Sequence, residues 1–386
     1  MPDTKTSFDP EWSLLLTACS AAPAEKNTEK IRHSLQRPIR WPLLFERADR
    51  HGVQPQLYES LQAVEDAVPA GERKLLAQAY QTNLHKNLFL SRELIRIMDC
   101  LSASNVEVFP YKGLALAEMV YGDIARRQSG DIDLLIRPSD LARIREAIHP
   151  LGYAPHSPLS ADAERASLKS GYECSFDGAA GPNLLELQWA IQPRFYAIDF
   201  DMEVLFRRAV TVAVSGRSMK TLRPPDLVLV LCAHAAKHVW GRLVWLCDIA
   251  RLIEQPSLDW DEIASAANHL GIARILRITL RLAHRMLGAA IPPAEGMVEG
   301  DTALRGLAEK IEAEIARDSP YNVESVAYFR LMMQLRERPM DRLRFLNRLV
   351  FTPGPGDWNA VRFPGPLFPL YRLVRLSRLA ARVVRA

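Results

Sequence analysis

Two aspartates one residue apart are the strongest chemical signal in the chain. Asp131 and Asp133 belong to the stretch Asp131–Ile136, whose apolar residues predict a β-strand. Successive side chains on a strand point to opposite faces, so both carboxylates project from one face. Hard oxygen ligands suit Mg²⁺, which proteins hold by one or two carboxylates together with substrate phosphates. The pair indicates metal-dependent phosphoryl or nucleotidyl transfer, although isolated pairs of this kind are often solvated charges.

A glycine turn precedes the aspartates. A short β-branched and aromatic run, residues 105–111, leads to Lys112 and Gly113, and then to a helix-forming stretch that reaches Tyr121. Glycine between a strand and a helix lets the backbone approach a phosphate, because the N–H groups at a helix N-terminus favour anions. An ordinary strand-to-helix turn has the same pattern. Only the aspartates that follow favour the interpretation that this turn binds phosphate.

A third carboxylate, Glu186, lies in a predicted hairpin. Two strand-like runs, Tyr172–Phe176 and Asn183–Trp189, flank the turn-rich segment Asp177–Pro182. Glu186 alternates with leucines in the second run, so it points away from one apolar face. Packed beside the aspartate strand, this hairpin would bring Glu186 to the same metal centre. Alone it would be read as a surface charge.

With these pieces in this order, the chain resembles the nucleotidyltransferase superfamily with the minimal polymerase-β-like fold. Within it, the chain resembles a bacterial family of uncharacterised nucleotidyltransferases. The motifs that carry the resemblance are YKGLALAEMVYGD, RQSGDIDLLIRPSDL, LLELQW, LRPPDLVLVLCAHAAKH and VWLCDIARLIE. Two positions depart from the pattern. Gly113 is flanked by Lys112 and Leu114 where the superfamily has Gly-Ser or Gly-Gly, and Gln188 stands where the family often has histidine.

The resemblance implies an α+β fold, with a minimal nucleotidyltransferase mixed sheet flanked by mostly helical N- and C-terminal regions. It implies Mg²⁺-dependent transfer of an NMP from an NTP such as ATP to a hydroxyl or phosphate of an acceptor, with release of pyrophosphate. Glu186 would complete a second metal site and help to deprotonate the acceptor. The implied catalytic and metal-binding residues are Asp131, Asp133 and Glu186, and the implied nucleotide-binding residues are Lys112, Gly113, Arg127, Ser129 and Lys237.

A second polar group falls in a predicted helix. His234, Lys237 and His238 are three and four positions apart, so they share one helical face. If this helix covers the sheet, Lys237 meets an NTP phosphate. Zinc is not expected there, because no HExxH arrangement and no third ligand are evident. Asp248 is expected to be a structural partner of this cluster, and Arg127 either holds a phosphate or lies on the surface beside the two acids.

The acceptor is open at this level. A small molecule, or a peptide or protein side chain, is favoured. Nucleic acid is not favoured, since the catalytic segment lacks a basic groove interleaved with aromatic residues. The alternative from another class is a non-catalytic partner-binding or regulatory protein that keeps the fold, and the presence of all three carboxylates argues against it. Kinase-like transfer is a weaker alternative, because the sequence has no Walker A or kinase loop motif.

Composition fits a cytoplasmic enzyme. The first residues lack the apolar core of a secretory signal, and the longest apolar run, Leu227–Ala236, is about half of a membrane span. The five cysteines are scattered, with no CxxC spacing, which indicates free thiols in a reducing compartment.

Four regions are predicted: helical 1–104, catalytic 105–220, helical 221–350, and a Pro-rich crossing segment with a basic helix, 351–386. From Arg336 to the C-terminus there are eleven arginines, no lysine and three acids, a balance of +8 in a chain of net charge +4. The last helix is expected to dock by its Leu/Val face with its arginines in water. Peripheral contact with anionic lipid, nucleic acid or an acidic partner through this helix is the other interpretation, and the oligomeric state is not predicted.

Overall fold

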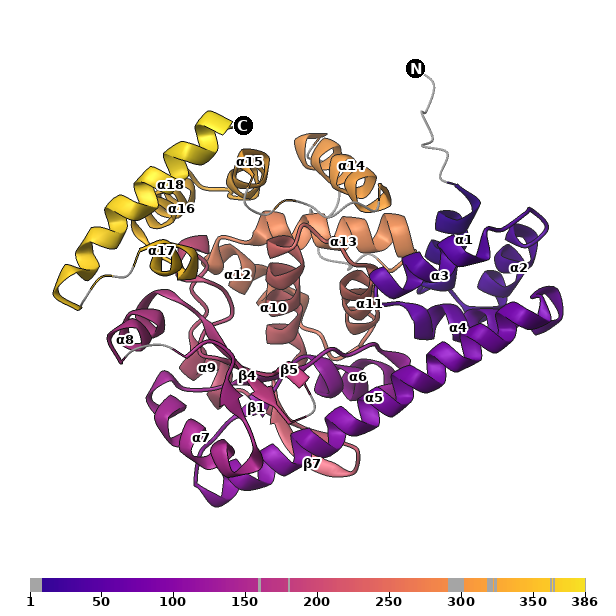
Figure 1. The fold of residues 1–386 in the computed structure, drawn as a ribbon. Coiled ribbons are helices and arrows are strands. Elements are labelled where there is room, and N and C mark those ends of the chain that lie inside the picture. Colours follow the sequence, from indigo (N-terminus) through magenta and orange to yellow (C-terminus); the bar gives the residue numbers. More distant parts are fainter. Residues whose placement is uncertain are drawn as a thin grey trace.

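A five-stranded mixed sheet lies between helices from both ends of the chain (Figure 1). The computed structural model describes residues 9–158, 161–179, 181–290, 302–317, 322, 325–361, 363 and 365–385. The predicted α+β fold class, a mixed sheet with helical flanks, is confirmed. The strands run in the order β1-β2-β5-β4-β3, with bounds Phe109–Pro110 for β1, Ile132–Leu135 for β2, Ala154–Pro155 for β3, Glu173–Gly178 for β4 and Gly181–Gln188 for β5.

The register of the central strands places the polar face. β2 and β5 are parallel, with Asp133 opposite Glu186, and every other pair in this sheet is antiparallel. Directly opposite residues project from the same face, so Asp133 and Glu186 are neighbours. β4 and β5 form the predicted hairpin, with Ser175 opposite Glu186 and Glu173 opposite Gln188.

The other face of the sheet is apolar. Leu134, Leu185 and Leu187 are buried there in a core shared with the helices α5 and α7. α7 (Leu141–Ile148) and α8 (Ala161–Ser170) occupy the crossover between β2 and β5, which also contains β3 and β4. Burial of the alternating leucines therefore fixes which side chains of β2 and β5 turn the other way.

The N-terminal helices end in a long rod. α5 (Ala70–Ala103) is 34 residues long and ends before Asn105, as its periodicity predicts. Its buried Asn83 and Asn87 donate side-chain hydrogen bonds to carbonyl groups of residues 124–127, which hold the approach to Asp131 against the helix. The helices before it are α1 (Pro10–Ala18), α2 (Ala24–Ser34), α3 (Trp41–Arg50) and α4 (Gln54–Gln62).

The helices after the sheet cover its polar side. α10 (Pro224–Lys237) stands between the sheet and α13 in Figure 1. The N-terminal helices and these later helices bury side chains in one common core, separate from the core under the sheet. The later helices are α11 (Leu243–Leu252), α12 (Trp260–Leu270), α13 (Ala273–Leu287), α14 (Thr302–Ala316) and α15 (Val326–Gln334). The chain shares cores across the predicted regions, and its division into four remains a prediction.

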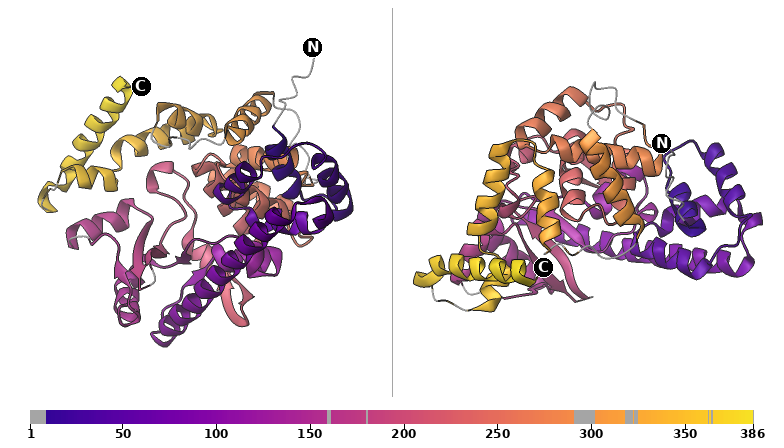
Figure 2. Two further views of the ribbon diagram at one scale, coloured as in Figure 1. Left: turned by 45° about the vertical axis from the view of Figure 1, so that its right-hand side comes forward. Right: turned by 90° about the horizontal axis from the view of Figure 1, so that it is seen from above.

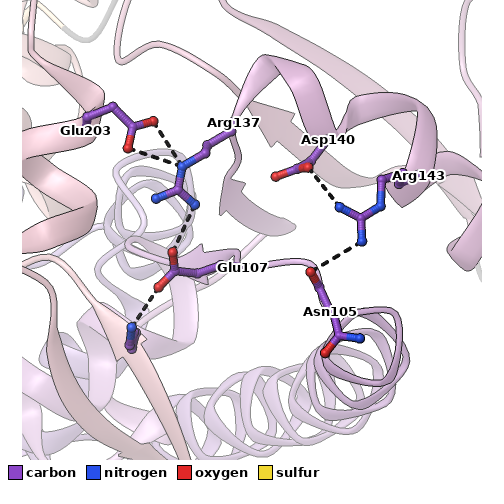
Figure 3. Close-up of polar contacts among 7 residues, drawn as sticks. Asn105, Glu107, Arg137, Asp140, Arg143 and Glu203 are labelled. Atoms are coloured by element: carbon purple, nitrogen blue, oxygen red, sulfur yellow. Dashed lines mark hydrogen bonds and ion pairs between the residues drawn. The ribbon is translucent and has the colours of Figure 1, made fainter.

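An ion-pair network ties a second, two-stranded sheet to the first. β6 (Val210–Val214) and β7 (Arg217–Thr221) follow the short helix α9 (Met202–Arg207). Figure 3 shows Arg137, just after β2, between Glu107 and Glu203. Lys220 of β7 donates a 2.6 Å hydrogen bond to Glu107, and this bond together with Arg137 holds the pKa of Glu107 below its usual value. The network connects the C-terminal end of β2 to its neighbours.

The C-terminal segment forms α16 (Pro339–Phe351), α17 (Pro355–Ala360) and α18 (Tyr371–Arg385), which lie at one edge of the molecule (Figure 2). The docking expected for the last helix is wrong. Arg375 and Arg378 of α18 turn toward the protein, whereas Leu373 is 62% exposed. The reason is Asp357, a fully buried carboxylate that forms ion pairs with Arg378 at 2.6 Å and with Arg375 at 3.5 Å. In the described parts of the chain, no helix is long and apolar enough to cross a membrane.

Candidate active site

Asp131, Asp133 and Glu186 lie within electrostatic reach of one another on the polar face of the sheet. Burial, followed by the neighbouring charge of Asp133, raises the pKa of Asp131 to about 6. Burial and then Asp133, Glu173 and Asp131 raise the pKa of Glu186 to about 8. Both shifts have the sign expected for carboxylates held close together with too little positive charge between them. Asp133 and Glu186 are neighbours in the sheet, and the convergence of all three carboxylates on one ion stays a prediction.

Lys112 neutralises one member of this group. Its ammonium lies 3.0 Å from Oδ1 of Asp133, and both side chains are largely buried. Burial alone would lower the pKa of Lys112, but Asp133 and Tyr111 together raise it above its usual value. Asp133 is consequently the anchored carboxylate of the pair, and Asp131, which is half-buried, is the one with less compensation.

Gln188 connects three carboxylates. Its amide nitrogen lies 3.0 Å from Asp133, 3.0 Å from Glu173 and 2.9 Å from Glu186. The hydroxyl of the buried Tyr111 donates to the amide oxygen of Gln188, so the amide is oriented with its nitrogen toward the acids. An amide donor partly compensates the negative charge without adding a titratable group.

The predicted glycine turn is present at the start of α6 (Gly113–Tyr121). Lys112 is the N-cap residue, and Gly113 has φ of +52°, in the left-handed region that glycine adopts without strain. A Cβ at Gly113 would lie 3.4 Å from the carbonyl oxygen of Asp131. The turn therefore brings the N-terminus of α6 against the aspartate strand, where free N–H groups favour an anion.

Ser129 and Lys86 border a cavity between α5 and the loop before Asp131. The cavity has a volume of about 520 Å³ and is lined by α5 together with Gln128 and Ser129. Ser129 is 5% exposed, and its hydroxyl oxygen is buried without a hydrogen-bond partner among the described residues. The charge of Lys86 acts on Asp131. A buried hydroxyl that lacks a partner beside a cavity suits a polar ligand.

Arg127 lies in a buried ion pair. Its guanidinium is bidentate with Asp248 of α11, at 2.9 Å for Nη2, and Tyr121 donates to the same carboxylate at 3.0 Å. The expected partnership of Asp248 with the histidine cluster is wrong, because α11 turns this carboxylate toward the loop before β2. The pair is largely shielded from solvent, and it fixes the loop that carries Ser129. Arg127 is thus neither a surface arginine nor free of a counter-ion.

The cluster on α10 faces the sheet. Lys237 donates a 3.1 Å hydrogen bond to the hydroxyl of Tyr172, and its ammonium stands 4.6 Å from the centre of that ring. Burial lowers the pKa of Lys237 to about 8, with Lys112 acting in the same direction and Glu173 and Glu186 opposing it. His234 and His238 pack against Trp245 with ring centres 5.2 and 5.1 Å away. Burial lowers the pKa of both histidines, so both are neutral at pH 7.

The donor set fits a hard divalent cation, but its side chains are not arranged as a closed metal site. Across the described ranges, no three His, Cys, Asp or Glu side chains have a metal-ligating arrangement. The carboxylates Asp131 and Glu186, with raised pKa values, are oxygen donors whose repulsion a cation would relieve.

Four contributors were not singled out from the sequence. Tyr111, Tyr172 and Glu173 contact the key side chains directly, and Lys86 acts on Asp131 from the long helix. Glu173 was within reach of inference, because it lies in the predicted hairpin two positions from Ser175, which faces Glu186. Lys86 had no sequence signal, since it precedes Asp131 by 45 positions and only tertiary packing brings it near.

The mixed sheet carries the glycine turn and the carboxylates that the motifs predicted. A family model described as an uncharacterised nucleotidyltransferase matches residues 37–288, which is more than half of the chain, and the chain belongs to this family. The resemblance read from the motifs is confirmed. The searches of curated proteins and of solved structures found no match.

Proposed function

We propose that this protein is a Mg²⁺-dependent nucleotidyltransferase that moves an NMP from an NTP, such as ATP, to an acceptor hydroxyl or phosphate. The observation that carries the proposal is the pairing of Asp133 with Glu186 across β2 and β5, next to Asp131 and the glycine turn. Membership of a nucleotidyltransferase family supports the class of reaction. The magnesium ion, when bound, supplies positive charge to the phosphates and to the entering and leaving oxygens.

Different residues are proposed to bind the cation and the NTP phosphates. Asp131, Asp133 and Glu186 would hold the cation, and Lys112 keeps Asp133 oriented by its 3.0 Å ion pair. Gly113 lets the NTP phosphates approach the N-terminus of α6. Lys237 from above and the unpartnered hydroxyl of Ser129 are further contacts for the phosphates. Arg127 positions the loop that carries Ser129, through Asp248.

The transfer itself conserves atoms and charge. The acceptor oxygen attacks the α-phosphorus and forms a new P–O bond, while the bond from that phosphorus to the bridging oxygen breaks. The electron pair leaves with pyrophosphate. Glu186 is the proposed acceptor of the hydroxyl proton.

The acceptor is proposed to enter by a cavity beside β3 and β4, on the side of the sheet where β3 is the edge strand. This cavity is about 440 Å³, a size suited to a small organic molecule, and it reaches Tyr172 and Glu173 beside the carboxylates. Its walls are largely apolar and include Trp189, Phe195 and Trp358. Among the described lining residues, the single arginine, Arg145, pairs with Glu164 at 3.2 Å. A neutral or cationic acceptor with an apolar body fits such a lining better than an RNA end does.

Product analysis tests the proposal. The protein is incubated with each NTP and Mg²⁺, and with low-molecular-weight and protein fractions of a lysate, and mass spectrometry then searches for an added NMP together with pyrophosphate. Glu186→Gln is the matched control, because it keeps the shape and the amide contact. Transfer by the natural protein that is absent from the variant supports the reaction. NTP binding without any transfer to either fraction favours the alternative, a non-catalytic partner-binding or regulatory protein with this fold.

A further inference from the structure

The C-terminal segment exposes an unusual share of the large apolar side chains. Of the twelve large hydrophobic residues that are exposed in the described chain, nine fall between residues 340 and 376. The other three, Leu75, Leu88 and Phe89, all lie on α5. The nine are Met340, Leu343, Leu346, Phe351, Val361, Leu367, Leu370, Leu373 and Leu376. Scattered exposed leucines are ordinary, but a concentration of this kind marks an interaction surface.

These residues form stripes on two helices that pack on each other. On α16, Met340, Leu343 and Phe351 lie on the face opposite the buried Phe345, and Met340 is 69% exposed. On α18, Leu373 and Leu376 face outward with the exposed Ala380, at the i, i+3, i+7 positions of one stripe. α16 and α18 are in contact with each other, and α18 runs along the outer edge of the molecule (Figure 2).

The orientation of α18 is held in place from within. Arg375 donates to the carbonyl of Leu349 at 3.0 Å, and Arg378 pairs with the buried Asp357 at 2.6 Å. A rotation that buried Leu373 would remove these arginines and leave Asp357 without its counter-ions. Because an unpaired buried carboxylate is costly, the outward position of the leucines is the stable one.

The segment that carries the stripes is rich in arginine. Residues 336–386 hold eleven arginines against three acids, a balance of +8, so the remainder of the chain carries −4. Arg372 is exposed next to the apolar positions of α18, and Arg344 of α16 is exposed while it lies 3.6 Å from the carboxylate of Asp199. An anionic lipid surface offers both parts of the complement, acyl chains for the leucines and phosphates for the arginines. A nucleic acid would match the charge but would leave the apolar stripes in water.

We propose that α16, η6 (Gly365–Leu370) and α18 form a surface, the C-terminal apolar surface, that binds anionic lipid bilayers from one side. The helices lie in the interface with Met340, Leu343, Leu373 and Leu376 at the acyl boundary. This binding does not depend on nucleotidyl transfer, so it stands or falls separately from the catalytic proposal.

Vesicle flotation tests the surface with the full chain. One set of vesicles is phosphatidylcholine alone, and the other has a roughly one-third fraction of phosphatidylglycerol. The natural protein should float with the anionic vesicles, bind the neutral vesicles less, and be released by high salt because the attraction is partly electrostatic. The double variant Leu373→Glu with Leu376→Glu should bind the anionic vesicles at least about tenfold more weakly.

The matched control carries the same change elsewhere. Leu75→Glu with Leu88→Glu also converts two exposed leucines, on α5, and should leave vesicle binding unchanged. Thermal unfolding of both double variants verifies that each is folded. Equal flotation of the natural protein and the Leu373/Leu376 variant would overturn the proposal. Failure of the natural protein to bind either vesicle type would also overturn it. In that case, binding of an oligonucleotide would point to nucleic acid, and a dimer seen by light scattering for the natural protein but not for the variant would point to self-association.

Discussion

The polar face of the sheet buries charged side chains, whereas the C-terminal apolar surface exposes large hydrophobic side chains to solvent. Around Asp133, charged groups are drawn into the protein, and Lys112 and Gln188 compensate them only in part. Around Asp357 the charge is also buried, but two arginines pair with it and the leucines are turned outward as a result. In the first region, buried carboxylates lack full compensation, and a bound cation would reduce their repulsion. In the second region, the buried carboxylate is paired with arginines, and this pairing keeps the apolar side chains of α18 exposed to solvent.

The largest expected effect separates the two regions by activity. Glu186→Gln or Asp131→Asn should reduce NMP transfer by roughly 10³-fold or more, because each removes a charged oxygen donor from the phosphates' surroundings. Leu373→Glu should leave transfer in solution unchanged, since Leu373 lies on the outer face of α18. Pyrophosphate release measures both. Turnover retained by Glu186→Gln would remove this residue from the mechanism.

The second prediction compares the two buried aspartates. Asp133→Asn leaves the ammonium of Lys112 without its partner, and Asp357→Asn does the same to Arg378, so each should lower the free energy of unfolding by about 3 kcal/mol. Asp131→Asn, by contrast, should be neutral or stabilising without Mg²⁺, because it removes repulsion. Chemical denaturation provides the values. A destabilised Asp131→Asn would show that its charge is already compensated.

The third prediction concerns pH and metal. The pKa of Glu186 is raised from 4.5 to about 8 in the folded protein, so its proton is bound more tightly there than in the unfolded chain. Its contribution to stability is therefore full below pH 4.5 and is lost as pH rises toward 8. Mg²⁺ should raise the Tm more at pH 8 than at pH 5, because protonated carboxylates bind it poorly. Differential scanning fluorimetry measures this, and Glu186→Gln should flatten the dependence.

The smallest effect is expected at the cover of the site. Lys237→Ala should raise the KM for NTP about tenfold through the loss of one charged contact, with little change in Tm. The matched control is Lys30→Ala, an exposed lysine on α2. Initial rates at several NTP concentrations separate KM from kcat. An unchanged KM would reduce Lys237 to a packing contact with Tyr172.

Local patterns were sufficient to predict the parts of the site that one strand or one turn creates. Alternation in β2 and β5 predicted the shared face of Asp133 and Glu186, and the glycine turn predicted the start of α6. Where two distant segments decide the outcome, the sequence was silent or misleading. The partner of Asp248 and the solvent-facing side of α18 both depend on which buried charge needs a counter-ion. Hydrophobic periodicity in the sequence does not show which charges will pair.

The parallel pairing of β2 with β5 also governs when the site comes into being. Asp133 and Glu186 are opposite in the sheet but 53 positions apart in the chain, with α7, α8 and two strands between them. Contacts of such separation form slowly, because a long loop must close before they contribute any stability. Helices such as α5 need only local contacts and form early. During refolding the helical signal should therefore return before the two carboxylates meet, and the candidate site is incomplete until the crossover has closed.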